Sequence, residues 1–122
     1  MRLNQVTVGT TDFDASAAFY ERLGLRRIVS SPPRYARFET PGGETFSIEQ
    51  VDEVRSTTIV YFEVEDVDSL VAELDLAIED GPADRPWLWR EARLFDPCGN
   101  EICLYQAGKN RRFPPWRIVA ED

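Results

Sequence analysis

The fold is decided by the stretch Phe95-Asp96-Pro97-Cys98-Gly99-Asn100-Glu101-Ile102-Cys103-Leu104-Tyr105, in which a tight turn precedes an alternating strand. A weaker copy lies upstream at Phe38-Glu39-Thr40-Pro41-Gly42-Gly43-Glu44-Thr45-Phe46-Ser47-Ile48-Glu49. Proline fixes one torsion of a turn and glycine readily adopts a positive φ, so Pro-x-Gly between two strand-like runs predicts a β-hairpin. The chain is therefore expected to contain two hairpins of related sequence.

Each hairpin is preceded by a strand, an Asp-x-Asp pair and a short helical run. The pairs begin at Asp12 and Asp66, 54 residues apart, and the hairpin prolines Pro41 and Pro97 lie 56 residues apart. This near-constant spacing predicts an α+β fold of two halves, each a strand, a helix and three strands. We expect a single domain over 1–122, with module one at about 2–50, a link at 51–56, module two at about 57–106 and a tail at 107–122.

Composition and charge narrow the class of protein. The chain has 122 residues, 43% of them hydrophobic, which suits one globular core, and no apolar run reaches the roughly 20 residues that a membrane span requires. The N-terminus lacks the plan of a signal peptide, so a cytoplasmic location is expected. A formal net charge of −8 argues against nucleic acid as a partner and mildly favours a cationic ligand. Cys98 and Cys103 show neither metal-binding nor disulfide spacing and are expected to be reduced thiols.

Capping and turn residues predict the individual elements. Asp14 can cap a helix that runs to Leu23, where Gly24 ends it. Its expected buried stripe is Ala15, Ala18, Phe19 and Leu23. In the second half we expect a helix from Ser69 to Leu76 and a loop around Gly81-Pro82. Strands are expected at Leu3–Thr11, at Arg26–Ser30, at Tyr35–Glu39, from Thr58 and from Glu91 onward.

Alternation along the strands separates two faces, because successive side chains point to opposite sides of a sheet. The apolar face, expected to carry the helices, contains Val6, Val8, Phe38, Phe46, Ile48, Val60, Phe62, Leu94, Ile102 and Leu104. The opposite face contains Gln5, Tyr35, Arg37, Ser47, Glu49, Ile59, Tyr61, Glu91, Arg93, Cys103 and Tyr105. Its mixture of aromatic and polar groups suits a small-molecule cleft, although a solvent-washed sheet face has a similar pattern.

Beside the paired modules, the chain carries Leu3-Asn4-Gln5 in its first strand, Phe19-Tyr20-Glu21-Arg22-Leu23-Gly24-Leu25, Tyr61-Phe62-Glu63-Val64-Glu65-Asp66-Val67 and Asp96-Pro97-x-Gly99-Asn100. In this order and spacing, these motifs resemble the vicinal oxygen chelate superfamily over roughly residues 2 to 106. This group contains glyoxalase I, extradiol dioxygenases, fosfomycin-resistance enzymes and bleomycin-resistance proteins. The resemblance implies two βαβββ modules whose curved mixed sheets enclose a shared cavity, usually within a homodimer.

Metal-using members of that superfamily take their ligands from one inward position on each of four strands. The resemblance places these positions at Gln5, Ser47, Ile59 and Cys103, and the internal repeat gives the same alignment. The chain has no histidine, and this set offers only two neutral oxygens, a hydrocarbon and a thiol, which poorly match hard divalent cations. No cofactor is therefore expected; a divalent metal would require Glu49 to join the set.

Acid–base chemistry without a metal is a second possibility. Glu49 or Glu91 can act as a general base if desolvated, with Tyr61 or Tyr105 as the proton donor. The alternative is that Arg37 and Arg93, at equivalent positions of the repeat, neutralise these carboxylates, which we favour. Cys103 lacks a histidine to form its thiolate, so a nucleophilic role is not expected.

Aromatic residues occur at two further places. Trp87 and Trp89 can point the same way from an extended strand, either as an aromatic wall for a ligand or as packing in the core or a dimer interface. In the proline-rich tail, Phe113, Trp116 and Ile118 are expected to dock on the body or on a second subunit. The less favoured alternative is that the arginines of the tail serve an anionic ligand.

Two functions remain. The first is a glyoxalase/bleomycin-resistance-like protein that binds a small organic molecule without a metal, and this is the one we favour. The second is a lyase or dioxygenase-type enzyme, using a reduced metal site or acid–base chemistry with Glu49 as the candidate catalytic residue. The residues expected to line the ligand cavity are Gln5, Tyr35, Arg37, Ser47, Glu49, Ile59, Tyr61, Trp87, Trp89, Arg93, Cys103 and Tyr105.

Overall fold

The computed structural model describes residues 2–55 and 57–118 and separates into two units. The first unit contains Met1–Thr58 together with the turn Phe95–Glu101, and the second contains Ile59–Leu94 and Ile102–Asp122. Each unit is described by itself. Within the described ranges, no helix is long and apolar enough to cross a membrane.

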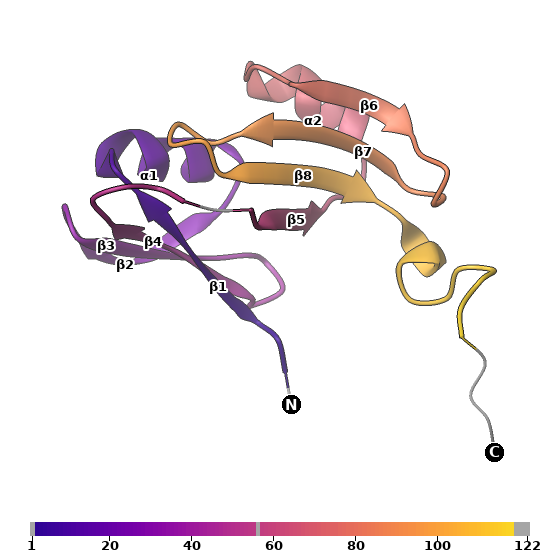
Figure 1. Ribbon diagram of the computed structural model, residues 1–122, viewed down its shortest axis with the longest axis horizontal. Coiled ribbons are helices and arrows are strands. Elements are labelled where there is room, and N and C mark those ends of the chain that lie inside the picture. Colours follow the sequence, from indigo (N-terminus) through magenta and orange to yellow (C-terminus); the bar gives the residue numbers. More distant parts are fainter. Residues whose placement is uncertain (1, 56, 119–122) are drawn as a thin grey trace. The chain divides into compact units, whose positions relative to one another are not determined.

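The first unit is a βαβββ module, as the repeat predicted (Figure 1). Its elements are β1 (Gln5–Thr10), α1 (Phe13–Arg22), β2 (Arg26–Ser31), β3 (Tyr35–Glu39) and β4 (Thr45–Gln50). The strand order is β1-β4-β3-β2, with β1 parallel to β4 and the other pairs antiparallel. The sheet is therefore mixed, and the strand entering the helix lies beside the last strand of the module.

Helix α1 begins two residues earlier than the sequence predicted. The cap is Asp12 rather than Asp14, because the Asp12 side chain accepts a hydrogen bond from the backbone N–H of Ala15 at 3.2 Å. Asp14 lies in the first turn, where its negative charge interacts favourably with the positive end of the helix dipole. The predicted buried stripe was wrong except for Phe19, since Ala18 is exposed and Ala15 and Leu23 are half-buried. The side chains that α1 buries are Phe13, Ser16, Ala17, Phe19 and Tyr20.

The core of the first unit lies between α1 and the apolar face of the sheet. Tyr20 is fully buried, with its ring centroid 4.4 Å from that of Phe46 and 5.0 Å from that of Phe19. Phe38 and Ile48 are also fully buried, as the alternation predicted. Burying a side chain of this size stabilises a fold by roughly 1.5–3 kcal/mol, so this cluster holds the helix on the sheet.

The turn Phe95–Glu101 is fixed within the first unit by a buried carboxylate. Asp96 accepts hydrogen bonds from the Tyr20 hydroxyl at 2.6 Å, the Cys98 N–H at 2.9 Å, and the Asn100 backbone N–H and side-chain amide, both at 2.8 Å. The Asn100 amide also donates to the backbone carbonyl of Gly9 at 2.9 Å. The Asp-Pro-x-Gly-Asn motif thus forms the turn and attaches it to α1 and β1.

The second unit repeats the same order of elements. Its elements are β5 (Ile59–Glu63), α2 (Val67–Leu74), β6 (Asp80–Asp84), β7 (Arg90–Phe95), β8 (Glu101–Gln106) and a short 3-10 helix, η1 (Gly108–Arg111). The strand order is β5-β8-β7-β6, the counterpart of the first sheet, and α2 lies against one face (Figure 1). Helix α2 is capped by Asp66 and ends at Asp75 in a left-handed conformation, so the predicted span Ser69–Leu76 was shifted by two residues.

The segment around Gly81-Pro82 is a strand, and the predicted loop there was wrong. It belongs to β6, which pairs antiparallel with β7 and carries a bulge between Asp80 and Ala83. Gly81 has a φ of +91°, and a Cβ on it would lie 2.4 Å from the carbonyl oxygen of Glu91. A bulge with a close backbone approach explains why glycine and proline occur inside a strand here.

The internal repeat predicted from the sequence is confirmed by local hydrogen bonds. Asp12 and Asp66 both accept a bond from the backbone N–H three residues later. In the first hairpin, Thr40 N–H donates to Glu44 O at 2.9 Å and Gly43 N–H to Thr40 O at 3.0 Å. Positions 96, 99 and 100 make the same two bonds at 2.9 and 3.0 Å in the second hairpin. The single-domain reading and the module limits stay predictions.

Candidate functional site

In the first unit, the predicted site residues form a chain of hydrogen bonds across three strands. The Gln5 amide donates to Ser47 Oγ at 2.7 Å, and Ser47 Oγ lies 2.7 Å from the Tyr35 hydroxyl. Arg37 Nε donates to the same Tyr35 oxygen at 2.8 Å. Thr45 donates to the side-chain carbonyl of Gln5 and so orients its amide towards Ser47.

Tyr35 receives most of the polar contacts in this cluster. Burial opposes ionisation, but hydrogen bonds from Ser47 and Arg37 outweigh it and lower the pKa of Tyr35 below its usual value. Glu49 lies opposite Tyr35 in the β3–β4 register, and its negative charge opposes this shift. A catalytic role for Glu49 requires its carboxylate to be shielded from water. Glu49 is exposed, so this condition is not met. Arg37 bonds to Tyr35 instead of the predicted partner Glu49.

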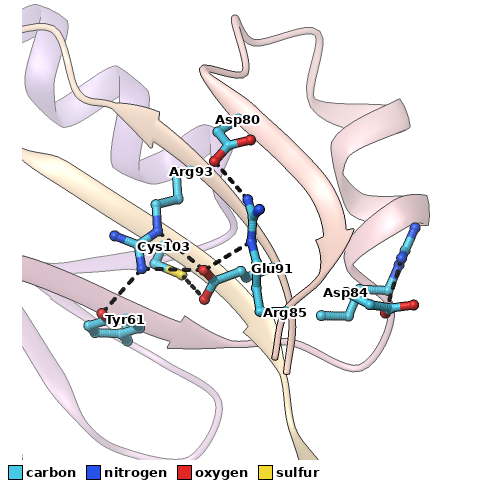
Figure 2. A network of polar contacts seen from close by, with 8 residues as sticks. Tyr61, Asp80, Asp84, Arg85, Glu91, Arg93 and Cys103 are labelled. Atoms are coloured by element: carbon cyan, nitrogen blue, oxygen red, sulfur yellow. Dashed lines mark hydrogen bonds and ion pairs between the residues drawn. The ribbon is translucent and has the colours of Figure 1, made fainter. Parts of the chain in front are cut away.

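In the second unit, the equivalent network has a buried carboxylate at its centre (Figure 2). Glu91 is 1% exposed, and its Oε1 lies 3.3 Å from Arg93 Nη2 and 3.4 Å from Arg85 Nε. The Cys103 thiol donates to its other oxygen at 3.3 Å, and Arg85 also pairs with Asp80 at 2.7 Å. The predicted pairing of Arg93 with Glu91 is confirmed. Because Glu91 is enclosed and paired, its role in this structure is to position the arginines.

The two networks are copies with different chemistry. By the repeat, Tyr35 corresponds to Glu91, Ser47 to Cys103 and Arg37 to Arg93, while the half-buried Ile59 stands where the first unit has Gln5. In both units the residue on the last strand bonds to the residue at the start of the third strand. The shared strand register explains the likeness of the two clusters.

Three aromatic residues of the second unit pack together. The rings of Trp89 and Tyr105 are stacked, with centroids 4.5 Å apart and an interplanar angle of 18°. Tyr61 meets both rings edge-on at 5.9 Å. The guanidinium carbon of Arg93 lies 5.8 Å from the Tyr61 ring centroid, and Arg93 Nη2 donates to the Tyr61 hydroxyl at 3.5 Å (Figure 2). These contacts fix the rings and the arginine in one arrangement.

A groove of about 470 Å³ adjoins this cluster, and we call it the aromatic groove. It is lined by Tyr61, Trp87, Trp89, Arg93, Asn110, Arg111, Pro114 and Trp116. Trp87 reaches it from the turn between β6 and β7, where Leu88 has a φ of +67°, and not from the extended strand that the sequence suggested. The predicted site residues Tyr61, Trp87, Trp89 and Arg93 are thus brought together, whereas Cys103 and Tyr105 are buried behind them.

The tail supplies the other wall of the aromatic groove, and its lining residues were not among the predicted cavity residues. The indole N–H of Trp89 donates to the backbone carbonyl of Asn110 at 3.3 Å and so attaches η1 to the sheet. Phe113, Trp116 and Ile118 are all exposed, so their predicted docking on a second subunit stays a prediction. The apolar composition of the tail indicated that the tail contacts another part of the protein. The position of that contact follows only from the turn that η1 makes.

The family metal positions do not fit a metal centre. Ser47 is fully buried and Gln5 turns its amide N–H groups towards it, so neither oxygen is presented to a cation. Ile59 has no donor atom, and the Cys103 thiol is buried against Glu91. Within 2–55 and 57–118, no three histidine, cysteine, aspartate or glutamate residues are grouped so as to hold a metal. The expectation of a metal-free protein stays a prediction that this donor chemistry supports.

The sequence profile of the Glyoxalase/Bleomycin resistance protein/Dioxygenase superfamily matches residues 2–104. The chain belongs to this superfamily. The resemblance inferred from the motifs is thereby confirmed.

Solved structures share the superfamily fold. One is a lactoylglutathione lyase from Agrobacterium tumefaciens, with a TM-score of 0.74, 18% identity and coverage of 96% of this chain and 97% of that one. Another is a bleomycin resistance determinant encoded on transposon Tn5, with a TM-score of 0.72, 19% identity and coverage of 88% and 99%. A family enzyme from Burkholderia phytofirmans PsJN has a TM-score of 0.71, 22% identity and coverage of 85% and 97%. Comparison with curated protein sequences gives no significant match.

Proposed function

We propose that the chain is a small-molecule-binding member of the superfamily that holds a flat aromatic ligand in the aromatic groove without a metal ion. The observation that supports this most directly is the groove itself, about 470 Å³ in volume and lined by three tryptophans and a tyrosine. Ligand pockets of proteins typically measure roughly 300–1,000 Å³ and combine aromatic area with a few orienting polar groups. The aromatic groove has both features.

Contacts with neighbouring residues hold one wall of the aromatic groove in place before a ligand binds. Trp89 is stacked on Tyr105 and bonded to Asn110, so one of the largest apolar surfaces of the groove is already fixed before a ligand arrives. Preformed walls reduce the entropy that binding must overcome. An added aromatic contact is worth roughly 0.5–1.5 kcal/mol beyond the area it buries.

Two further expectations belong to this proposal. A homodimer accords with the exposed aromatic tail, and a metal-free site accords with the donor set described above. The alternative of a lyase or dioxygenase-type reaction would require a catalytic group, and Glu49, the candidate for it, is exposed to solvent. The relatives include both a lyase and a resistance determinant, so the fold alone does not choose between the two functions.

Calorimetric titration of the full chain with 2-naphthol, a neutral flat aromatic probe, tests the proposal. We expect Trp89→Ala and the more exposed Tyr61→Ala each to weaken binding roughly three- to tenfold, because each removes a ring from the groove. Tyr35→Phe is the matched control, since Tyr35 is not among the lining residues of the groove and the change should leave the affinity unchanged. No binding by the wild type, or equal affinity in all four proteins, would contradict an aromatic site in this groove.

A further inference from the structure

We propose that the ligand of the aromatic groove is an aromatic anion, of the aromatic carboxylate class, whose charged group pairs with Arg93 and Arg111. This inference rests on the proposed function and adds the charge of the ligand to it. The net charge of the chain suggested a cationic ligand, whereas the charged residues that line the groove are arginines.

The charged residues that line the aromatic groove are both arginines. Arg93 and Arg111 occur among the described lining residues, and none of these described residues is a carboxylate. The Arg93 side chain is 24% exposed and the Arg111 side chain 48%, so both side chains reach solvent. Guanidinium presents a planar fork of N–H donors that matches a carboxylate in geometry and charge.

Within residues 2–55 and 57–118, the carboxylates that pair with these two arginines are not lining residues of the groove. Glu91, which pairs with Arg93, is 1% exposed and also pairs with Arg85. The partner of Arg111 is Glu63, at 3.9 Å, and Glu63 is not a lining residue. In the part of the chain that the structure describes, the arginines of these pairs line the groove and the two carboxylates do not.

Neighbouring side chains fix the position of the Arg93 guanidinium before a carboxylate ligand binds. Its guanidinium is fixed by Glu91 on the buried side and by the Tyr61 ring, whose centroid lies 5.8 Å from Cζ. The Cys103 thiol donates to Glu91 and so holds that carboxylate in place. A charged group whose position is set by its neighbours loses little freedom when a ligand binds.

The formal charge of −8 opposes an anion at long range, but it does not decide the outcome. At physiological ionic strength, interactions between exposed charges fade over about 8 Å. Contacts between a bound carboxylate and a guanidinium act at hydrogen-bond distance and are screened much less. The local arginines should therefore determine which charge the groove accepts.

The test compares three probes of the same ring system by calorimetry at 150 mM NaCl: 2-naphthoate, neutral 2-naphthamide and cationic 2-naphthylmethylammonium. We expect 2-naphthoate to bind about tenfold tighter than 2-naphthamide, and the ammonium probe to bind weakest. Arg111→Gln should reduce the preference for naphthoate over naphthamide roughly threefold or more. The matched control is Arg112→Gln, which removes an exposed neighbouring charge that is not a lining residue.

Arg93→Gln serves as a second variant, with circular dichroism and thermal unfolding confirming that it folds. It should also reduce the preference for naphthoate over naphthamide. Equal binding of naphthoate and naphthamide, still weakened by Trp89→Ala, would overturn the anion proposal and leave the aromatic site standing. Tightest binding of the ammonium probe would overturn it in favour of a cation. Failure of all three probes to bind would overturn both proposals.

Discussion

At the scale of single residues, Asp96 organises the first unit. Asp96 is 4% exposed, and its carboxylate accepts hydrogen bonds from Tyr20, Cys98 and Asn100, so directed N–H and O–H groups surround it. Burial, reinforced by the Asp96 charge, raises the pKa of Tyr20 well above its usual value, so the phenol remains the donor. This carboxylate is the physical reason for the Asp-Pro-x-Gly-Asn motif.

Replacing Tyr20 with phenylalanine should therefore destabilise the protein without changing its shape. Removing the hydroxyl takes one donor from a buried carboxylate, and an unsatisfied buried group costs about 1–3 kcal/mol. The free energy of unfolding in urea measures the effect. Tyr35→Phe, at a half-exposed position, is the control and should change stability less. Equal stability of the Tyr20 variant and the wild type would show that Asp96 needs no bond from the helix.

Cys98 is the second residue whose surroundings predict a measurable property. Burial tends to raise its pKa, but bonds from Thr10 at 3.3 Å, from the Thr11 N–H at 3.3 Å and hydroxyl at 3.5 Å, and from Ser16 at 3.6 Å lower the pKa to about 7. The fraction of thiolate therefore rises as the pH increases through about 7, and the thiolate is the reactive form.

The rate of alkylation by iodoacetamide should follow this fraction, reaching about a tenth of its plateau one pH unit below the midpoint. The measurement is made on Cys103→Ala, in which Cys98 is the remaining cysteine, since Cys103 is buried and bonded to Glu91. Cys98→Ala should show no reaction. A midpoint near the ordinary thiol value of about 8.5 would mean that the neighbouring hydroxyls do not favour the thiolate.

At the scale of elements, the start of α1 makes a direct prediction. Asp12→Ala should lower the free energy of unfolding by about 1 kcal/mol, because it leaves the Ala15 N–H without its acceptor. Asp14→Ala is the matched comparison two residues later and should have a smaller effect, since Asp14 interacts only with the helix dipole. A larger loss of unfolding free energy from Asp14→Ala than from Asp12→Ala would identify Asp14 as the cap, as the sequence alone suggested.

At the scale of the whole molecule, the tail is predicted to be part of the binding site. A chain ending at Arg112 lacks Pro114 and Trp116 and should bind 2-naphthol roughly threefold or more weakly, while retaining its circular dichroism spectrum. A chain ending at Ile118 keeps every lining residue and is the control. Unchanged affinity of the shorter chain would assign the site to the sheet residues alone.

The repeat and the sheet faces could be predicted from the sequence because they depend on local turns and alternation, whereas the superfamily was inferred from the resemblance of its motifs. The buried stripe of α1 could not be predicted. It depends on where the helix begins, and the cap is Asp12 rather than Asp14. The Gly81-Pro82 bulge was read as a loop because glycine and proline indicate turns unless a partner strand is known. The aromatic groove depends on contacts between the tail and β5 to β7, and no local pattern specifies them.

The turn at Phe95–Glu101 belongs with the first unit although both flanking strands belong to the second. A gene divided after residue 58 would therefore yield a first fragment in which Tyr20 and the Gly9 carbonyl lack their acceptor and donor. The second fragment would carry that missing piece on the hairpin between β7 and β8. The two polypeptides should regain the native state by complementation when mixed, rather than fold as independent modules.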